Sequence, residues 1–336
     1  MTTNERDGTP RAAKIRALRA EMRLPLIAAP MLLVSGPDLL IACCKAGVVG
    51  SVPLQGARTA QVLEDWLTRI DDELAEARET AAPGRKIAPY ALNLVEYNIP
   101  PERMGANLRL IRRFKPRIVI TSFGKPGEVV QLVHDYGGLV FHDVATVPHA
   151  EKAIEAGVDG LIALTSGAGG HCGLLNPFAF VPQLRRVFDG AILLAGCVSD
   201  GRSLRAAEVL GADFGYVGTR FIATPESLAP PAYRELMVAQ TSTDVLTTDR
   251  ISGVNATFLR GSLAQAGLDP DRLPALKGAR QPDLPEGVRP WRDIWSAGQG
   301  VGMVDRMMPV AELVAEFERG YRAAATGTET PMAASV

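Results

Sequence analysis

His171 is the residue whose surroundings most clearly indicate chemistry. It lies in the segment SGAGGHCG, residues 166–173, with glycines on both sides. Glycines allow the backbone to pass close to a flat ligand and leave room for the imidazole to reach into a cleft. A histidine can remove or donate a proton near neutral pH. Because the segment follows an apolar run typical of a strand, we predict a functional role for His171.

Two further glycine-rich segments indicate phosphate binding. The runs LLAGCVSDG and YVGTR place Gly196, Gly201, Gly218 and Thr219 at the ends of two expected strands. Backbone N–H groups approach a phosphate closely only where side chains are small or absent. One such loop alone would be better explained by a tight turn. Two consecutive loops of this kind favour a phosphate site.

Other reactive residue types give weaker signals. His142 and Asp143 end another apolar run, where they could face the same site, and grouping them with His171 as metal ligands is the alternative. The dense His and Asp pattern of metal-dependent barrel hydrolases is absent, so we predict no metal site. Cys43 and Cys44 are adjacent in an apolar stretch and are expected to be buried, and no C-x-x-C pair occurs.

The elements that must position these residues are eight short apolar runs separated by helix-length segments. Runs that are apolar throughout are typical of parallel strands buried on both faces. Eight strand–helix units favour a closed (β/α)8 TIM barrel of class α/β, and a doubly wound open sheet is the alternative. The runs are Leu24–Met31, Gly47–Leu54, Ile87–Leu94, Arg117–Phe123, Gly138–Val144, Gly160–Ser166, Ala191–Val198 and Phe214–Phe221. In a barrel, working groups gather at the carboxyl ends of the strands.

The regular alternation stops before the chain ends. We therefore expect a barrel over residues 1–226, a small and mainly helical lid or insertion over 227–304, and a C-terminal helix over 305–325 that returns to the barrel. The first 20 or so residues are expected to be a loose arm or an extra helix. Proline and glycine are frequent in the insertion, so no helical or strand periodicity of apolar residues can be recognised within it.

Composition excludes several classes of protein. The formal net charge is −1, so the chain offers no broad basic surface for nucleic acid. No window approaches the ~18 apolar residues of a membrane span, and the N-terminus lacks the apolar region of a signal peptide. Four cysteines without an export signal suggest a cytoplasmic location. A P-loop, a nucleophile elbow and a complete dinucleotide fingerprint are also missing.

Taken together, the motifs resemble those of the nitronate monooxygenases, formerly called 2-nitropropane dioxygenases. These are FMN-dependent TIM-barrel oxidoreductases, grouped with NAD(P)H:quinone reductases and flavin-dependent enoyl reductases. The resemblance runs from about Leu24 to Tyr321. It rests on PLIAAPM, AGVVGS, ALNL, AGVDGLIALTSGAGGHCG, LLAGCVSDGRSLRAAEVLGADFGYVGTRFIATPES and AGQGVG.

The resemblance implies an FMN across the barrel mouth and His171 as the catalytic residue. The residues that it places at the cofactor are Ala29, Pro30, Met31, Asn93, Gly169, Gly170, Gly196, Cys197, Gly218, Thr219 and Gln299. Three positions depart from the usual pattern: Gly167 replaces a glutamate, Cys197 a glycine and Asp143 a lysine. A lysine near the flavin would stabilise the negative charge of reduced FMN, whereas an ionised aspartate would destabilise that charge.

The implied activity is oxidation of alkyl nitronates or nitroalkanes by O2 to a carbonyl compound and nitrite, with His171 as base. The alternatives are an NAD(P)H-dependent FMN reductase of quinones or enoyl thioesters, and a non-catalytic flavin-binding barrel. The expected partners are therefore a small-molecule substrate, O2 and, for the reductase, NAD(P)H. We expect no nucleic-acid or membrane partner, and a homodimer is left open.

Overall fold

The protein is a closed barrel of eight parallel strands surrounded by helices, as expected from the apolar runs. A computed structural model describes residues 9–97, 99–278 and 280–327. The strands pair in the order β1-β9-β8-β6-β5-β4-β3-β2, and a parallel bridge between Ile27 and Val49 joins the two ends of that order. The strands are β1 (Leu26–Ala28), β2 (Gly50–Pro53), β3 (Tyr90–Val95), β4 (Ile118–Ser122), β5 (Leu139–Val144), β6 (Gly160–Leu164), β8 (Ala191–Ala195) and β9 (Phe214–Val217).

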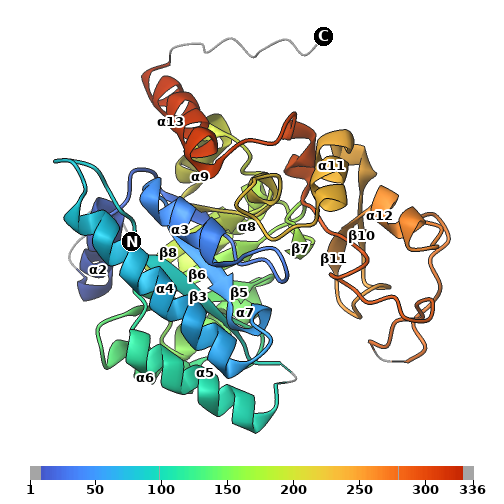
Figure 1. Ribbon diagram of the computed structural model, residues 1–336, viewed down its shortest axis with the longest axis horizontal. Helices are drawn as coiled ribbons and strands as arrows, with labels where there is room; N and C mark the ends of the chain where they lie inside the picture. Colours follow the sequence, from blue (N-terminus) through green and yellow to red (C-terminus); the bar gives the residue numbers. More distant parts are fainter. Residues whose placement is uncertain (1–8, 98, 279, 328–336) are drawn as a thin grey trace.

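Amphipathic helices cover the outside of the barrel (Figure 1). They are α3 (Pro37–Lys45), α4 (Ala60–Glu79), α5 (Pro101–Phe114), α6 (Gly127–His134), α7 (Val147–Glu155), α8 (Pro177–Val187), α9 (Gly201–Leu210) and α13 (Val310–Thr326). In α4, the Thr59 hydroxyl accepts a hydrogen bond from the Val62 N–H and caps the helix, as its sequence predicts. The same helix buries Leu63, Leu67 and Leu74 at helical spacing.

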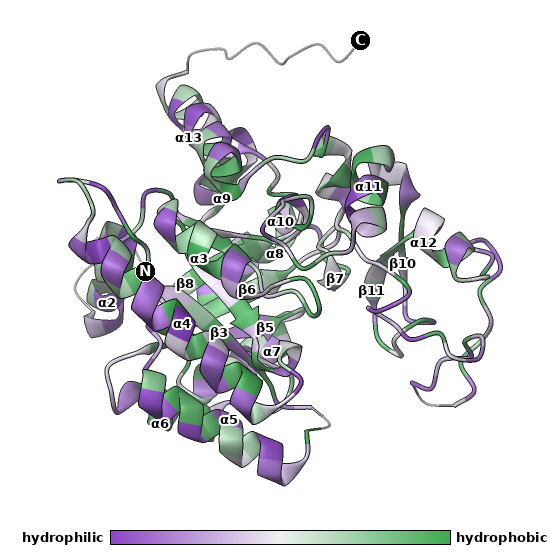
Figure 2. Cartoon of the chain, viewed as in Figure 1, coloured by the Kyte–Doolittle hydropathy of each residue, from purple (hydrophilic) through white to green (hydrophobic). Residues whose placement is uncertain are grey.

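The core has two layers because strand residues alternate between the lumen and the helices. Ile120, Phe141 and Phe214 belong to the cluster inside the barrel, whereas Val119 and Val140 pack outward against helices. Figure 2 shows the apolar strands enclosed by helices with mixed surfaces. Which layer a residue joins therefore depends on its phase along the strand.

A helix closes the amino end of the barrel. Helix α2 (Pro10–Ala20) and the turn after it add Leu18 and Met22 to the lumen cluster, which also contains Ala88 and Ile118. The extra helix expected at this end is therefore present over Pro10–Ala20, whereas residues 1–8 lie outside the described residues. With this end covered, the carboxyl ends of the strands form the accessible mouth.

The segment between β9 and α13 adds a feature that the sequence did not indicate. It contains α10 (Thr219–Ile222), α11 (Pro231–Ala239), α12 (Arg260–Gln265), the 3-10 helices η2 (Ser242–Asp244) and η3 (Gln299–Met303), and a hairpin of β10 (Val245–Thr248) and β11 (Ala256–Leu259). Strand β11 pairs with β7 (Gly170–His171), opposing Ala256 to His171 (Figure 1). The insertion thus holds the backbone of the candidate catalytic residue.

The C-terminal helix completes the outer ring. Helix α13 packs against both α9 and α3, filling the position between the last and the first barrel helices (Figure 1). A β-carbon at Gly201 would lie 2.1 Å from the Phe317 carbonyl oxygen, so only glycine allows this close approach. None of the described helices combines the length and apolarity that crossing a membrane requires.

Candidate active site

Four polar side chains form the uppermost layer of the lumen, at the mouth. Alternation from the buried residues of the same strands places Asn93, Ser122, Asp143 and Tyr216 on the lumen face of β3, β4, β5 and β9. Below them the lumen is apolar, with Phe141 and other side chains of the inner cluster. The floor of the mouth is therefore polar, whereas the layer beneath it is apolar.

Hydrogen bonds connect three of these side chains in a row. The Asn93 amide Nδ2 donates to Ser122 Oγ at 3.0 Å, and Ser122 Oγ donates to Asp143 Oδ2 at 2.6 Å. Burial raises the pKa of Asp143 to about 6, although the Ser122 hydrogen bond opposes the shift. Asp143 Oδ1 is buried and has no hydrogen-bond partner among the described residues. Asn93 was predicted for this site, whereas Ser122 and Tyr216 were missed.

His171 lies between two aromatic rings that converge on it from different elements. Its ring centroid is 5.3 Å from that of Phe123 and 5.1 Å from that of Trp291, both in edge contacts. Burial lowers the pKa of His171, so the imidazole is neutral at neutral pH. Within the described ranges no protein group hydrogen-bonds its ring nitrogens. The imidazole is thus in the form that can accept a proton.

The two aromatic neighbours are held in an unusual backbone conformation. Phe123 has φ +60° and Trp291 has φ +68°, in the left-handed region that non-glycine residues rarely adopt. Such strain of about 1–3 kcal/mol per residue persists where the surrounding structure imposes it, often at functional sites. Neither residue was predicted, because no local pattern shows that a loop residue reaches His171 from β4 or from the insertion.

The predicted phosphate loops meet in space. Thr219 Oγ1 accepts a hydrogen bond from the Gly298 N–H at 2.9 Å, and the Gln299 N–H donates to the Gly167 carbonyl at 3.0 Å. A β-carbon at Gly169 would lie 2.9 Å from the backbone nitrogen of Gly298. The loops after β6, β8 and β9 therefore converge with the start of η3, bringing together Gly169, Gly196, Cys197, Gly218, Thr219 and Gln299.

Two departures from the family pattern are coupled here. Gly196 and Cys197 both have positive φ, +126° and +59°, which explains why glycine suits both positions. A β-carbon at Gly167 would lie 2.6 Å from Cys197 Sγ and 2.8 Å from Gln299 Oε1. The Cys197 side chain therefore occupies the space next to residue 167, and the glycine there makes room for it.

The loop after β1 borders the glycine cluster at Gly218. Ala29 N–H donates to the Val217 carbonyl, and Met31 N–H donates to Ser35 Oγ at 3.0 Å. The Met31 Sδ atom lies 3.2 Å from the position of a β-carbon on Gly218. Ala29, Pro30 and Met31 thus border the loop that carries Gly218, while Gly170, in β7, donates its N–H to Ser296 Oγ at 2.8 Å.

The second candidate histidine lies outside the mouth. His142 alternates with Asp143, so it faces the surrounding helices together with Val140 and Val144. Its Nδ1 is 2.7 Å from Thr121 Oγ1, and burial lowers its pKa to about 4. His142 is therefore a neutral, hydrogen-bonded residue behind the strand. No cluster of three or more metal-ligating side chains occurs among the described residues.

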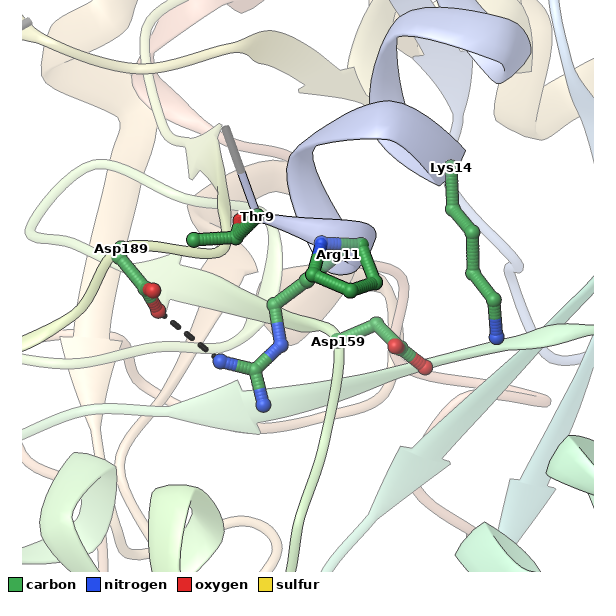
Figure 3. A pocket seen from close by; sticks show the side chains of 6 residues that line it. Thr9, Arg11, Lys14, Asp159 and Asp189 are labelled. Carbon is green, nitrogen blue, oxygen red and sulfur yellow. Dashed lines mark hydrogen bonds and ion pairs between the residues drawn. The ribbon is translucent and has the colours of Figure 1, made fainter. Parts of the chain in front are cut away.

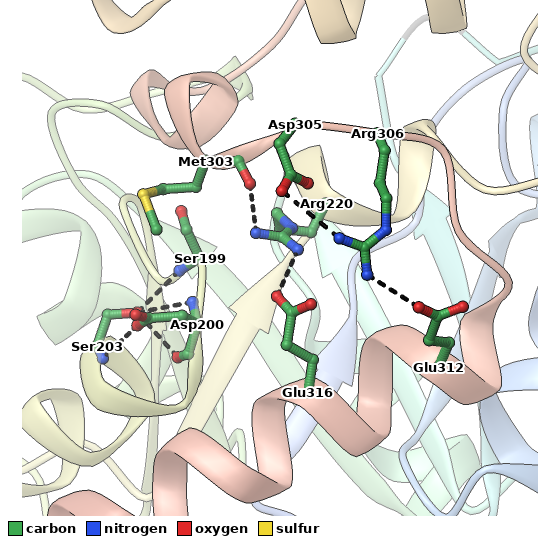
Figure 4. A network of polar contacts seen from close by, with 9 residues as sticks. All are labelled: Ser199, Asp200, Ser203, Arg220, Met303, Asp305, Arg306, Glu312 and Glu316. Atoms are coloured by element: carbon green, nitrogen blue, oxygen red, sulfur yellow. Dashed lines mark hydrogen bonds and ion pairs between the residues drawn. The ribbon is translucent and has the colours of Figure 1, made fainter. Parts of the chain in front are cut away.

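A buried arginine anchors the loop after β9. Arg220 donates to the Met303 carbonyl and forms an ion pair with Glu316 at 3.0 Å, so it links α10, η3 and α13 (Figure 4). Nearby, Asp200 accepts a hydrogen bond from the Ser203 N–H and caps α9. Displacing the Gly218–Thr219 loop would leave the buried Arg220 guanidinium without its carboxylate partner, so this network opposes that displacement.

Two cavities lie away from the mouth. One, of about 330 Å³, is lined by residues of α2 with Asp159 and Asp189, and is bridged by an ion pair from Arg11 to Asp189 (Figure 3). The other, of about 770 Å³, lies beside α3 and α13 and is lined by Arg23, Lys45 and Glu318 among others. Neither shares a residue with the polar floor or the glycine loops.

Comparison with known proteins agrees with the geometry. The family model for nitronate monooxygenase matches residues 16–319. A nitronate monooxygenase of Pseudomonas aeruginosa is 30% identical, covering 86% of this chain and 94% of its own. One from Paraburkholderia phytofirmans is 28% identical over 88% of this chain and 91% of its own.

Solved structures show the same fold. A nitroalkane oxidase from Streptomyces ansochromogenes superposes with a TM-score of 0.76 at 23% identity, covering 93% of this chain and 99% of its own. FabK from Thermotoga maritima superposes with a TM-score of 0.73 at 22% identity, covering 94% and 97%. At this identity the structures establish the barrel alone, whereas the matched family model spans nearly the whole chain. The chain belongs to the nitronate monooxygenase family.

Proposed function

We propose that this chain is an FMN-dependent enzyme that oxidises alkyl nitronates or nitroalkanes with O2 to a carbonyl compound and nitrite. The observation that carries the proposal is the His171 imidazole, which is neutral, without a protein hydrogen-bond partner in the described structure, and enclosed by aromatic rings at the barrel mouth. The relatives named nitronate monooxygenase support the substrate class.

The residues at the mouth suit an FMN. The glycine loops after β8 and β9 would hold the phosphate, since a side chain at Gly196 would meet Thr165 Oγ1 at 2.3 Å and the backbone N–H groups of such loops can approach an anion. Ala29, Pro30, Met31 and Asn93 would line the ring system, with Gly169, Gly170 and Gln299 beside it. The unpaired Asp143 Oδ1 leaves a polar atom for the cofactor. When bound, the flavin supplies the redox chemistry.

His171 would act as the general base. A neutral nitroalkane must lose a proton from the carbon next to the nitro group before it can be oxidised, and a neutral imidazole can accept that proton. Phe123 and Trp291 cover part of the ring, and burial of the imidazole favours its neutral form. A positioned base contributes roughly 10²–10⁴-fold to rate.

The test compares His171→Asn with the wild-type enzyme on two substrates, a neutral nitroalkane and its preformed nitronate. Because the nitronate has already lost the proton, the variant should lose about 10²–10⁴-fold in kcat/KM on the nitroalkane and far less on the nitronate. Equal losses on both substrates would remove the assignment of His171 as base. FMN content measured on each sample separates a catalytic loss from loss of cofactor.

The second candidate is an NAD(P)H-dependent flavin reductase of quinones or enoyl thioesters. It is favoured by apolar side chains exposed near the mouth, among them Phe178 at 71%, Leu174 at 66% and Tyr97 at 60% exposure, which would suit a larger apolar substrate. Anaerobic mixing with NADH or NADPH discriminates the two. Rapid bleaching of the flavin absorbance would support the reductase, whereas reduction by nitronate alone would support the oxidase.

Two further expectations belong to this proposal. Cys43, Cys44, Cys172 and Cys197 are all unpaired, which accords with a reducing compartment, and we propose a cytoplasmic location. A homodimer is the assembly to test by sedimentation velocity. A non-catalytic flavin-binding barrel would be the conclusion if the protein bound FMN but neither nitronate nor NAD(P)H reduced it.

A further inference from the structure

Asp143 combines burial with an unsatisfied atom at the floor of the mouth. Its Oδ2 accepts the Ser122 hydrogen bond, whereas Oδ1 is buried and without a partner in the described part of the chain. An unpaired buried polar atom destabilises a fold, and an unpaired buried charge destabilises it more. Most buried side-chain oxygens in folded proteins are satisfied by protein groups or by ordered water. The orphaned Oδ1 therefore indicates a missing partner.

The charges around Asp143 determine which proton state it adopts. No cation is among the causes that shift its pKa, which burial raises to about 6. Tyr216 on β9 interacts electrostatically with Asp143, His171 lies on β7, and Glu96 directly follows β3. Burial keeps Tyr216 protonated and His171 neutral, so neither compensates a negative charge on Asp143. Glu96 is itself an acid whose pKa burial raises to about 7.

We propose that Asp143 is a proton-bearing hydrogen-bond donor to the flavin, with its carboxyl O–H directed at an acceptor atom of the bound cofactor. Ser122 fixes the orientation by donating to Oδ2, which leaves the proton on Oδ1, the atom without a protein partner. Asp143 is thus a positioning residue for the cofactor and a neutral replacement for the lysine of the family pattern. This inference rests on the proposed FMN site.

The proposal predicts that FMN binding is linked to protonation of Asp143. Binding selects the protonated acid, so the affinity should fall as pH rises above the pKa of the free protein, by up to tenfold per pH unit. Asp143→Asn is the matched variant, because an asparagine can accept from Ser122 and still offer an N–H at the position of Oδ1. Its FMN affinity should lack this linkage.

The experiment measures FMN dissociation constants by quenching of flavin fluorescence, with full-length protein freed of flavin, at pH values from 5 to 8.5. The ratio of the wild-type constant to the Asp143→Asn constant cancels titration of the FMN phosphate. We expect this ratio to be flat below pH 6 and to rise at least tenfold by pH 8. A ratio that stays constant within twofold, or that falls with pH, would overturn the proposal.

Two further variants make the result specific. Asp143→Leu removes the donor without adding charge and should bind FMN about tenfold more weakly than Asp143→Asn at every pH. Equal binding by these two variants would overturn the hydrogen bond. Glu96→Gln removes the other carboxyl with a raised pKa and should retain the wild-type pH dependence. If it abolishes that dependence, the titrating group is Glu96 and the assignment to Asp143 fails.

The same measurements separate this inference from the proposed function. If neither wild type nor variants bind FMN at any pH, the proposed cofactor is wrong. If all bind FMN with one common pH dependence, the cofactor stands and only the role of Asp143 is lost.

Discussion

The two sides of the barrel mouth are built by different means. On the side of β8 and β9, the site consists of backbone brought close by glycine, where an added β-carbon at Gly196 or Gly169 would meet other atoms within 3.0 Å. On the side of β3 to β5, it consists of buried side chains that share hydrogen bonds, ending at Asp143. The first side is sensitive to added volume, the second to changed protonation.

The largest effect should come from adding one methyl group to the backbone side. Gly196→Ala places a β-carbon 2.3 Å from Thr165 Oγ1 at φ +126°, so both crowding and backbone strain oppose it. We expect a loss of about 3–5 kcal/mol in the free energy of unfolding, measured by urea denaturation. Gly84→Ala is the control, because Gly84 has φ +82° with no atom within 4 Å, and it should cost only about 1 kcal/mol. Equal costs would show that contact at Gly196 is unimportant.

On the side-chain side, the effect should depend on pH. The folded-state pKa of Asp143, about 6, exceeds its usual 3.8, so the folded protein binds the extra proton and wild-type stability should fall as pH rises between these values. Asp143→Asn lacks this titration. Without flavin, the variant should therefore exceed wild type in free energy of unfolding by at most about 3 kcal/mol above pH 6, and by nothing below pH 4. A difference that is independent of pH would contradict the raised pKa.

Substitutions at Cys197 test whether a side chain on the glycine-rich side of the mouth lowers the stability of the protein. Because its φ is +59°, Cys197→Gly should stabilise the protein by about 1 kcal/mol, seen as a higher urea midpoint. Gly167→Ala should destabilise wild type, since the new β-carbon would meet Cys197 Sγ at 2.6 Å, and should cost less in the Cys197→Gly background. Additive effects would mean that the two family departures are independent.

The smallest effect should be a change in the His171 pKa when an aromatic neighbour is removed. Trp291→Ala should admit water to one side of the imidazole and raise the His171 pKa toward 6.5, as followed by NMR titration. Tyr136→Phe, in a tyrosine that hydrogen-bonds the Pro116 carbonyl on the outer layer, serves as control and should leave the titration unchanged. An unchanged pKa in Trp291→Ala would show that other groups dehydrate the ring.

The sequence predicted the backbone side better than the side-chain side. Eight apolar runs and their glycines are local signals. In the structure these runs form eight barrel strands, with Gly196, Gly218 and Thr219 at one end of the barrel. Ser122 and Tyr216 depend on the phase of each strand, which runs that are apolar throughout do not reveal. Phe123 and Trp291 reach His171 from loops far apart in the chain, so their role is a tertiary property.

The hairpin of the insertion was missed for a different reason. Strands β10 and β11 have four residues each and lie among frequent turns, so no period of two could emerge. Their pairing with β7 is stabilised by the tertiary contact rather than by local propensity. The helices expected in that segment are present as α11 and α12.

Helix α13 has a consequence for the order in which the molecule assembles. It fills the gap between α3 and α9, yet the ribosome produces it only after the whole insertion. Until then the apolar sides of α3 and α9 lack their partner, so a nascent barrel remains exposed to chaperones and proteases. The hairpin that holds His171 is by that time already synthesised. Closure of the outer ring is thus the last of these steps, because it depends on the final helix of the described chain.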